Sequence, residues 1–155
     1  MEHSKKHTVE PLTYDSYMAV VRNSPGTRMF RNLYATVDGE RKDITKNGEL
    51  SCAFFVSSVL LPFKLIKEMH ATVTSTVVDL EAVGWSVTDN PSPGDVIEWD
   101  EADLGNSGPH KHIGFYIGNE TAISNSHTEG APVEHSWRLS DRDIVKILSY
   151  PYFNK

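Results

Sequence analysis

The sequence predicts an α+β fold, in which helices come first and an antiparallel sheet follows. Up to Gly84 the apolar residues recur mainly at helical spacing. From Trp85 onward, short β-branched and aromatic runs alternate with turns that contain glycine or proline. Because helices and strands segregated along the chain are typical of α+β proteins, we expect the helices to pack on one antiparallel sheet.

The N-terminal part of the chain predicts an extension, a helix and a series of turns. Residues 1–11 are polar and are expected to form a flexible extension. A short helix is expected over residues 12–22, because the breaker cluster at residues 23–26 ends its apolar pattern. Residues 27–37 fit helix or strand equally well. Turn signals follow at residues 38–43 and 47–48.

The middle of the chain predicts a buried helix over residues 51–61. Its apolar residues Phe55, Val56, Val59 and Leu60 follow the rhythm of one helix face. Pro62 interrupts this helix. Two more helical stretches are expected, over residues 64–69 and over residues 73–83, and Gly84 ends the second as a C-cap.

The last third predicts strands. A Ser-Pro-Gly-Asp turn at residues 92–95 leads into the first, and a polar loop over residues 100–111 leads into the second. The strand at residues 121–126 is expected to pair with the second strand as a hairpin. The expected strands cover residues 96–99, 112–118, 121–126, 130–137 and 144–150.

Length and composition limit the class of protein. A chain of 155 residues predicts a single domain over residues 1–155. With 15 basic and 21 acidic residues the net charge is −6, which argues against nucleic acid as a partner. No apolar run reaches the ~18 residues of a membrane span and no secretory signal is visible, so we expect no membrane insertion and a cytoplasmic location as synthesised. The sequence leaves the oligomeric state open.

A single cysteine, Cys52, excludes an intrachain disulfide and any multi-cysteine metal site. It stands at the start of the predicted helix over residues 51–61. A helix N-terminus stabilises a thiolate, and its free N–H groups can bind an oxyanion. The alternative is a small buried thiol that only packs.

A cysteine nucleophile needs a base, and His112 is the best candidate. It opens a strand directly after a polar loop, so its side chain can face a cleft. His110 stands beside Pro109 in the loop and is expected to be solvated. Because His110 and His112 have no cysteine or carboxylate at a recognisable ligand spacing, we expect no metal, and we expect no other cofactor.

Three motifs in order, GELSCAFFVSSVL, PGDVIEW and HIGFYIGNE, resemble the NlpC-type papain-like cysteine peptidases, a family related to the CHAP amidases. The resemblance covers roughly residues 25–150. It implies a papain-like fold, in which the helix that carries the nucleophile packs on a central antiparallel sheet. Members of the family mostly cleave amide bonds in bacterial cell-wall peptides.

The resemblance implies roles for particular residues. Cys52 would be the nucleophile and His112 the general base. Ser124 falls at the third position, where the family usually has histidine, and Asn125 or His127 could orient His112 instead if the strand contained a bulge. The Cys52 backbone N–H would bind the oxyanion, and Tyr34 is the nearest match to a tyrosine that assists it.

The expected function is therefore that of a cysteine peptidase or amidase. It would cleave an amide bond in a peptide or peptidoglycan fragment through a thioester, in a bacterium or a phage. Delivery to the cell wall would need a non-classical or phage route. Two alternatives remain: a non-catalytic binding module that retains the fold, and a lipid-directed acyltransferase, whose acyl groove could be lined by Phe54, Phe55 and Phe63.

Overall fold

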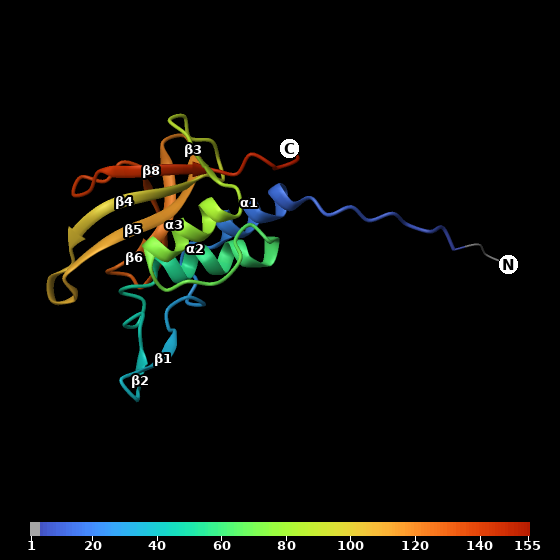
Figure 1. The fold of residues 1–155 in the computed structure, drawn as a ribbon. Helices are drawn as coiled ribbons and strands as arrows, with labels where there is room; N and C mark the ends of the chain where they lie inside the picture. Colours follow the sequence, from blue (N-terminus) through green and yellow to red (C-terminus); the bar gives the residue numbers. More distant parts are fainter. Residues whose placement is uncertain (1–3) are drawn as a thin grey trace.

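The computed structural model describes residues 4–155 and shows three α-helices and two antiparallel sheets, which confirms the α+β class (Figure 1). The main sheet has six strands in the order β3-β8-β4-β5-β6-β7. The helices are α1 (Thr13–Asn23), α2 (Cys52–Leu60) and α3 (Val73–Ala82). The strands of the main sheet are β3 (Ser86–Val87), β4 (Val96–Asp103), β5 (Pro109–Gly118), β6 (Thr121–Ser126), β7 (Ala131–Ser136) and β8 (Ile144–Ser149).

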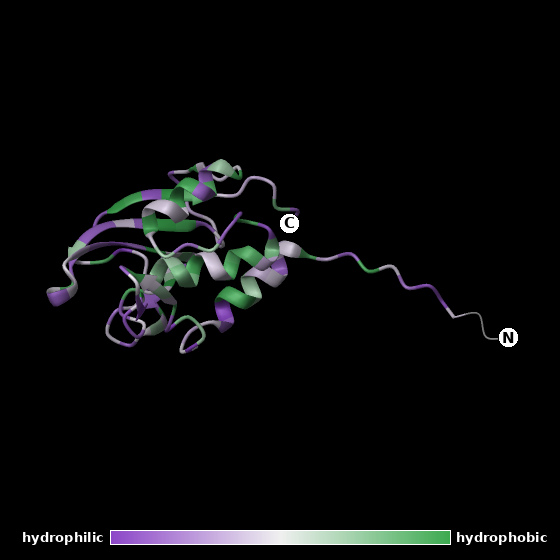
Figure 2. Ribbon diagram, turned by 60° about the horizontal axis from the view of Figure 1, so that its bottom comes forward, coloured by the Kyte–Doolittle hydropathy of each residue, from purple (hydrophilic) through white to green (hydrophobic). Residues whose placement is uncertain are grey.

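Helix α2 packs against β5 and β6 and is flanked by α1 and α3. Phe55 of α2 meets Phe115 of β5 edge to face at 5.4 Å between ring centroids, and Tyr17 of α1 meets the same ring at 5.9 Å. These three rings are fully buried. Figure 2 shows that hydrophobic residues gather in the helices and in the strands that they cover. The core therefore fixes α2 against β5.

The opposite face of the sheet carries a second, smaller cluster centred on Trp99. Trp99 is fully buried, and its indole Nε1–H donates to the Trp137 carbonyl at 2.9 Å. Tyr116 packs edge to face on the Trp137 ring. The buried members of this cluster are Ile97, Trp99, Tyr116, Ala122 and Ile147.

Two sequence-based expectations about regular structure are wrong. Residues 64–69 form no helix, because Lys64 is left-handed with φ 57° and the backbone N–H groups of Lys67 and Glu68 donate to the Asp79 carboxylate. The expected polar loop over residues 100–111 is mostly strand. β4 continues to Asp103 through a bulge after Trp99, and β5 already begins at Pro109.

A small hairpin, formed by β1 (Tyr34–Val37) and β2 (Glu40–Asp43), stands apart from the main sheet. The sequence predicted only a turn over residues 38–43. Asp43 holds the base of this hairpin, because its carboxylate accepts from the Thr45 hydroxyl, the Leu33 N–H and the Asn32 amide. These bonds outweigh the effect of burial, which raises a carboxyl pKa, and keep the pKa of Asp43 below its usual value.

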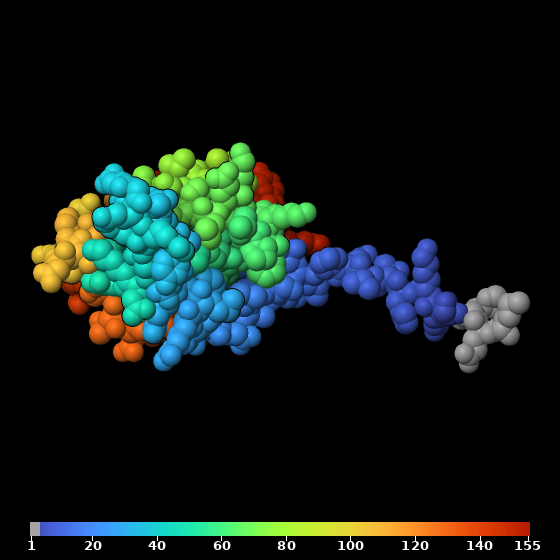
Figure 3. Space-filling view, turned by 90° about the horizontal axis from the view of Figure 1, so that it is seen from below, coloured from blue at the N-terminus to red at the C-terminus, as the bar shows by residue number. Residues whose placement is uncertain are grey.

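The expected N-terminal extension over residues 1–11 lies partly outside the described residues. Its described part, residues 4–11, is exposed and has no helix or strand. Figure 3 shows this part projecting away from the body of the molecule. Among residues 4–155, no helix combines the length and the apolar character that crossing a membrane requires.

Candidate active site

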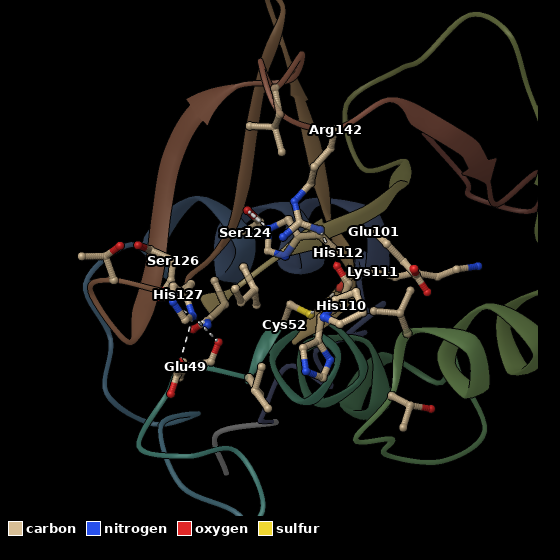
Figure 4. Close-up of a pocket in the computed structure, with 18 of the residues that line it drawn as sticks. Glu49, Cys52, Glu101, His110, Lys111, His112, Ser124, Ser126, His127 and Arg142 are labelled. Carbon is tan, nitrogen blue, oxygen red and sulfur yellow. Dashed lines mark hydrogen bonds and ion pairs between the residues drawn. The ribbon is translucent and has the colours of Figure 1, made fainter. Parts of the chain in front are cut away.

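A pocket of about 760 Å³ lies where the start of α2 meets the sheet (Figure 4). Cys52 comes from α2, His112 from β5, Ser124 from β6 and His135 from β7. Arg142, which lies just before β8, lines the same pocket. The fold thus brings together the predicted nucleophile, the predicted base and the predicted third residue, which are up to 72 positions apart in the chain.

Cys52 is the first residue of α2, as its predicted place at a helix start requires. No side chain of residues 4–155 caps this helix by a hydrogen bond. The Sγ atom lies 4.0 Å from the Lys111 carbonyl, and the backbone N–H groups of Ile113 and Ala53 point toward it. In residues 4–155 no hydrogen bond joins this thiol directly to His112.

Burial raises the pKa of the Cys52 thiol above its usual value. The N–H groups of Ile113 and Ala53 and the charge of Arg142 lower it, but they do not outweigh burial. The helix N–H groups thus act in the expected direction, toward a thiolate, but burial has the larger effect on the pKa of Cys52. The resting residue is a neutral thiol at neutral pH.

His112 is held between Trp99 and Ser124. Its Nε2 atom lies 2.8 Å from the Ser124 Oγ, and its ring lies 5.3 Å from the Trp99 ring at an angle of 34°. One edge of the ring faces the pocket, while burial of the rest, together with the smaller effects of the nearby Arg142 and His135, lowers the pKa of His112 to about 3. The imidazole is therefore neutral at pH 7, which a general base must be.

Ser124 hydrogen-bonds His112, and neither Asn125 nor His127 does. Successive side chains of β6 point to opposite faces of the sheet. Asn125 points toward α2 and donates to the Gly48 carbonyl at 2.7 Å. His127 lies beyond the end of the strand, with Nδ1 3.6 Å from a carboxylate oxygen of Glu49. Both residues line the pocket, and Figure 4 shows His127 apart from His112, on the side of Glu49.

Gly114 makes room for the contact between His112 and Ser124. Gly114 pairs with Ser124 across β5 and β6. A Cβ atom at residue 114 would lie 2.6 Å from the Ser124 Cβ, 2.8 Å from the Ile123 carbonyl oxygen and 3.1 Å from the Trp99 ring. Any side chain there would therefore push β6 away from β5.

We expect Gly114→Ala to destabilise the protein by ~1–3 kcal/mol, the usual cost of overpacking a filled site. The contacts at 2.6 and 2.8 Å involve backbone and a Cβ atom, which cannot swing aside. Urea unfolding at pH 7 measures the change. An unfolding free energy equal to that of the parent protein would show that the two strands can separate without cost.

Sequence reasoning missed Arg142 and did not place His135 beside Ser124. Arg142 anchors the pocket wall, because its Nη1 donates to the carbonyls of His110 at 2.6 Å and of Asp100 at 2.9 Å. His135 contacts Ser124, with 2.6 Å between Nε2 and Oγ. An arginine in a loop belongs to no motif. The alternation of β7 could have placed His135 on the Ser124 face only after its register with β6 was known.

Other predicted site residues lie elsewhere. Tyr34 is 70% exposed on β1 and does not line the pocket, so the expectation that it assists the oxyanion is corrected. The hairpin β1–β2 carries it away from α2. His110 lies in β5 and not in a solvated loop, and its Nε2 is 2.6 Å from the Ser107 carbonyl oxygen.

The three phenylalanines considered for an acyl groove serve packing. Phe55 is fully buried, Phe54 packs against Phe30, and Phe63 packs against Tyr17. None of the three lines this pocket. In residues 4–155 no group of three or more histidine, cysteine or carboxylate side chains is arranged to hold a metal ion.

What the site can do chemically follows from its parts: a thiol, a neutral imidazole and helix N–H groups that no side chain among residues 4–155 caps face one pocket. No protein-family model matches this sequence, and no curated protein matches it.

Proposed function

We propose that this protein is a thiol hydrolase with an NlpC-type papain-like fold, which cleaves an amide bond through a thioester on Cys52. The observation that carries the proposal is the shared pocket of Cys52, His112 and Ser124, in which the imidazole is neutral and bonded to Ser124 through Nε2. A nucleophile, a base and a group that orients the base are the minimal set for such catalysis.

In the proposed reaction the Cys52 Sγ attacks the carbonyl carbon of the amide, and its proton passes to His112. The electrons of the carbonyl double bond move to its oxygen, which accepts hydrogen bonds from the first N–H groups of α2. When the intermediate collapses, the C–N bond breaks and His112 gives the proton to the leaving amine. A water molecule, deprotonated by His112, then hydrolyses the thioester and restores the thiol.

This sequence of steps suits a neutral thiol and a neutral imidazole. Because burial raises the pKa of Cys52 and lowers that of His112, a preformed thiolate–imidazolium pair is disfavoured in the free protein. Proton transfer therefore accompanies attack. Hydrogen bonds of catalytic groups are often long before substrate binds and shorten in the complex, which fits the weak contact of the resting thiol.

We propose a bacterial cell-wall peptide as the substrate. The resemblance of the Cys52 and His112 motifs supports this choice, and so does the charge of the pocket. The side chains of Arg142 and Lys111 can form ion pairs with carboxylates of a peptide. The carboxylates of the pocket can form ion pairs with its amines. The carboxylates that line the pocket are Glu49, Glu101 and Asp141.

The test is mass spectrometry of purified peptidoglycan after digestion. We expect the parent protein to release fragments in which one amide bond has gained one water. His112→Ala should slow this release by ~100- to 10,000-fold, the usual contribution of a positioned general base. His7→Ala, in the exposed extension, is the control and should digest like the parent.

Two results would contradict the proposal in different ways. Equal digestion by the parent and by His112→Ala would remove His112 from the mechanism. Digestion by neither would remove the cell-wall peptide as the substrate.

A further inference from the structure

Three side chains next to the pocket form a continuous chain of hydrogen bonds. His112 Nε2 lies 2.8 Å from Ser124 Oγ, and the same Oγ lies 2.6 Å from His135 Nε2. His135 Nδ1 lies 2.7 Å from the Ser136 carbonyl oxygen. The chain thus runs from the predicted base to a backbone carbonyl, which can only accept.

The carbonyl at the end fixes the direction of every bond in the chain. Because the Ser136 oxygen accepts, His135 Nδ1 must carry the proton and donate it. Burial lowers the pKa of His135, so its ring is neutral at pH 7 and Nε2 has no proton. Nε2 must then accept from the Ser124 hydroxyl, which has one hydrogen to give.

With its hydrogen given to His135, Ser124 can only accept from His112. Nε2 of His112 must therefore carry the proton of the neutral ring. Its other nitrogen, Nδ1, keeps a free lone pair in the pocket that His112 shares with Cys52. This is the tautomer that can take a proton from the thiol.

We propose that His135 is a positioning residue, which acts through Ser124 to hold His112 in the tautomer with the proton on Nε2. The catalytic consequence rests on the proposed function, but the tautomer itself does not. A serine alone could not set this direction, because a hydroxyl can rotate and either donate to Nε2 or accept from it.

The packing around the chain supports a fixed geometry. The buried Trp99 ring lies 5.3 Å from the His112 ring and 5.8 Å from the His135 ring, so one indole contacts both imidazoles. Ser124 itself is only 2% exposed, which leaves its hydroxyl little access to bulk water. The departure from the histidine that the family usually has at the third position is thereby offset by a histidine from the next strand, β7.

The primary test is ¹⁵N NMR of the imidazole nitrogens, which distinguishes the two tautomers without any substrate. In the parent at pH 7 we expect His112 to be protonated on Nε2. In His135→Leu the Ser124 hydroxyl loses its acceptor, so a population protonated on Nδ1 should appear. His135→Gln offers a carbonyl oxygen as acceptor and should restore the parent tautomer, while Glu134→Leu, exposed on the same strand, is the matched control.

A second measurement links the tautomer to the thiol. We expect His135→Leu to slow alkylation of Cys52 by iodoacetamide at pH 7 by about 10-fold, since the wrong tautomer of a catalytic histidine is a poor base. If the variant hydrolyses the substrate, the loss should fall on kcat and not on KM, because the hydrogen bond between His135 and Ser124 sets the proton position on His112, which matters in the chemical step.

The outcomes separate this proposal from the proposed function. A parent protein with the His112 proton on Nδ1, or a His135→Leu variant with an unchanged tautomer and unchanged alkylation, would overturn the role of His135. The parent spectrum decides even if the variant fails to fold. A tautomer that shifts as expected in a protein without hydrolytic activity would instead support the positioning role of His135 and contradict the proposed function.

Discussion

Replacing Cys52 with alanine is expected to abolish hydrolysis, because no other thiol exists in the chain to form the thioester. Removal of a covalent nucleophile usually costs ~10,000-fold or more in kcat. Cys52→Ser is expected to be nearly as inactive, since a neutral imidazole that serves a buried thiol is a weak base for an alcohol of much higher pKa. Peptidoglycan digestion followed by mass spectrometry measures both variants.

A matched control is available on the same helix. Ser58→Ala also removes one side-chain heavy atom from α2, and the Ser58 hydroxyl is buried without a hydrogen-bond partner in residues 4–155. We expect this variant to keep the parent activity. Far-ultraviolet circular dichroism checks that all three variants are folded. Hydrolysis by folded Cys52→Ala at the parent rate would exclude a thioester mechanism.

Acidification is expected to destabilise the protein through His112. The folded-state pKa of about 3 lies below the usual value of 6.5, because burial and the nearby Arg142 and His135 oppose a positive charge on this ring. Between these two values the unfolded chain binds a proton that the folded chain does not. The free energy of unfolding should therefore be highest above pH 6.5 and fall by up to ~1.4 kcal/mol for each pH unit toward 3.

Urea unfolding at pH 7 and at pH 5 measures this effect. His135 adds to it in the same direction, because burial lowers its pKa as well. His112→Gln should flatten the dependence on pH, while His7→Gln in the exposed extension should leave it unchanged. A parent and a His112→Gln variant that lose the same stability between pH 7 and pH 5 would show that His112 is not buried as a neutral ring.

The sequence was informative where a local pattern has one physical meaning. The apolar rhythm from Phe55 to Leu60 predicted α2, and the helix begins at Cys52, where the expected N-terminus lay. The strands expected over residues 112–118 and 121–126 were predicted to pair as a hairpin, and the structure has this hairpin as β5 and β6. These features depend on residues that are close together in the chain, so a short stretch of sequence contains the interactions that produce them.

The sequence failed where distant groups compete with local preference. Residues 64–69 look helical, but the Asp79 carboxylate from α3 binds their backbone N–H groups and holds them in another conformation. Tyr34 lies near Cys52 in sequence only, because the hairpin β1–β2 leads the chain away before it returns to α2. Neither effect has a signal within a short window of sequence.

At the site itself, the sequence by itself determined which residue types were available: one thiol at a helix start, a histidine in a strand later in the chain, and a polar strand after it. It placed Ser124 at the third position and left Asn125 and His127 as alternatives that a bulge in the strand would favour. The tertiary structure decided among them, because the register of β6 on β5 sets which face each side chain takes. Register depends on how two strands pack across the sheet, and the register of β7 on β6 also brings His135 to the pocket.

The same distinction holds for the charge states. The sequence places Cys52 at a helix N-terminus, which alone favours a thiolate. Whether that thiol and its histidine are charged depends on how much water reaches them, and water is excluded by residues from α2, β4, β5 and β6 that meet only in the folded protein. Burial is a property of the assembled chain, and it is the reason that the pair rests neutral.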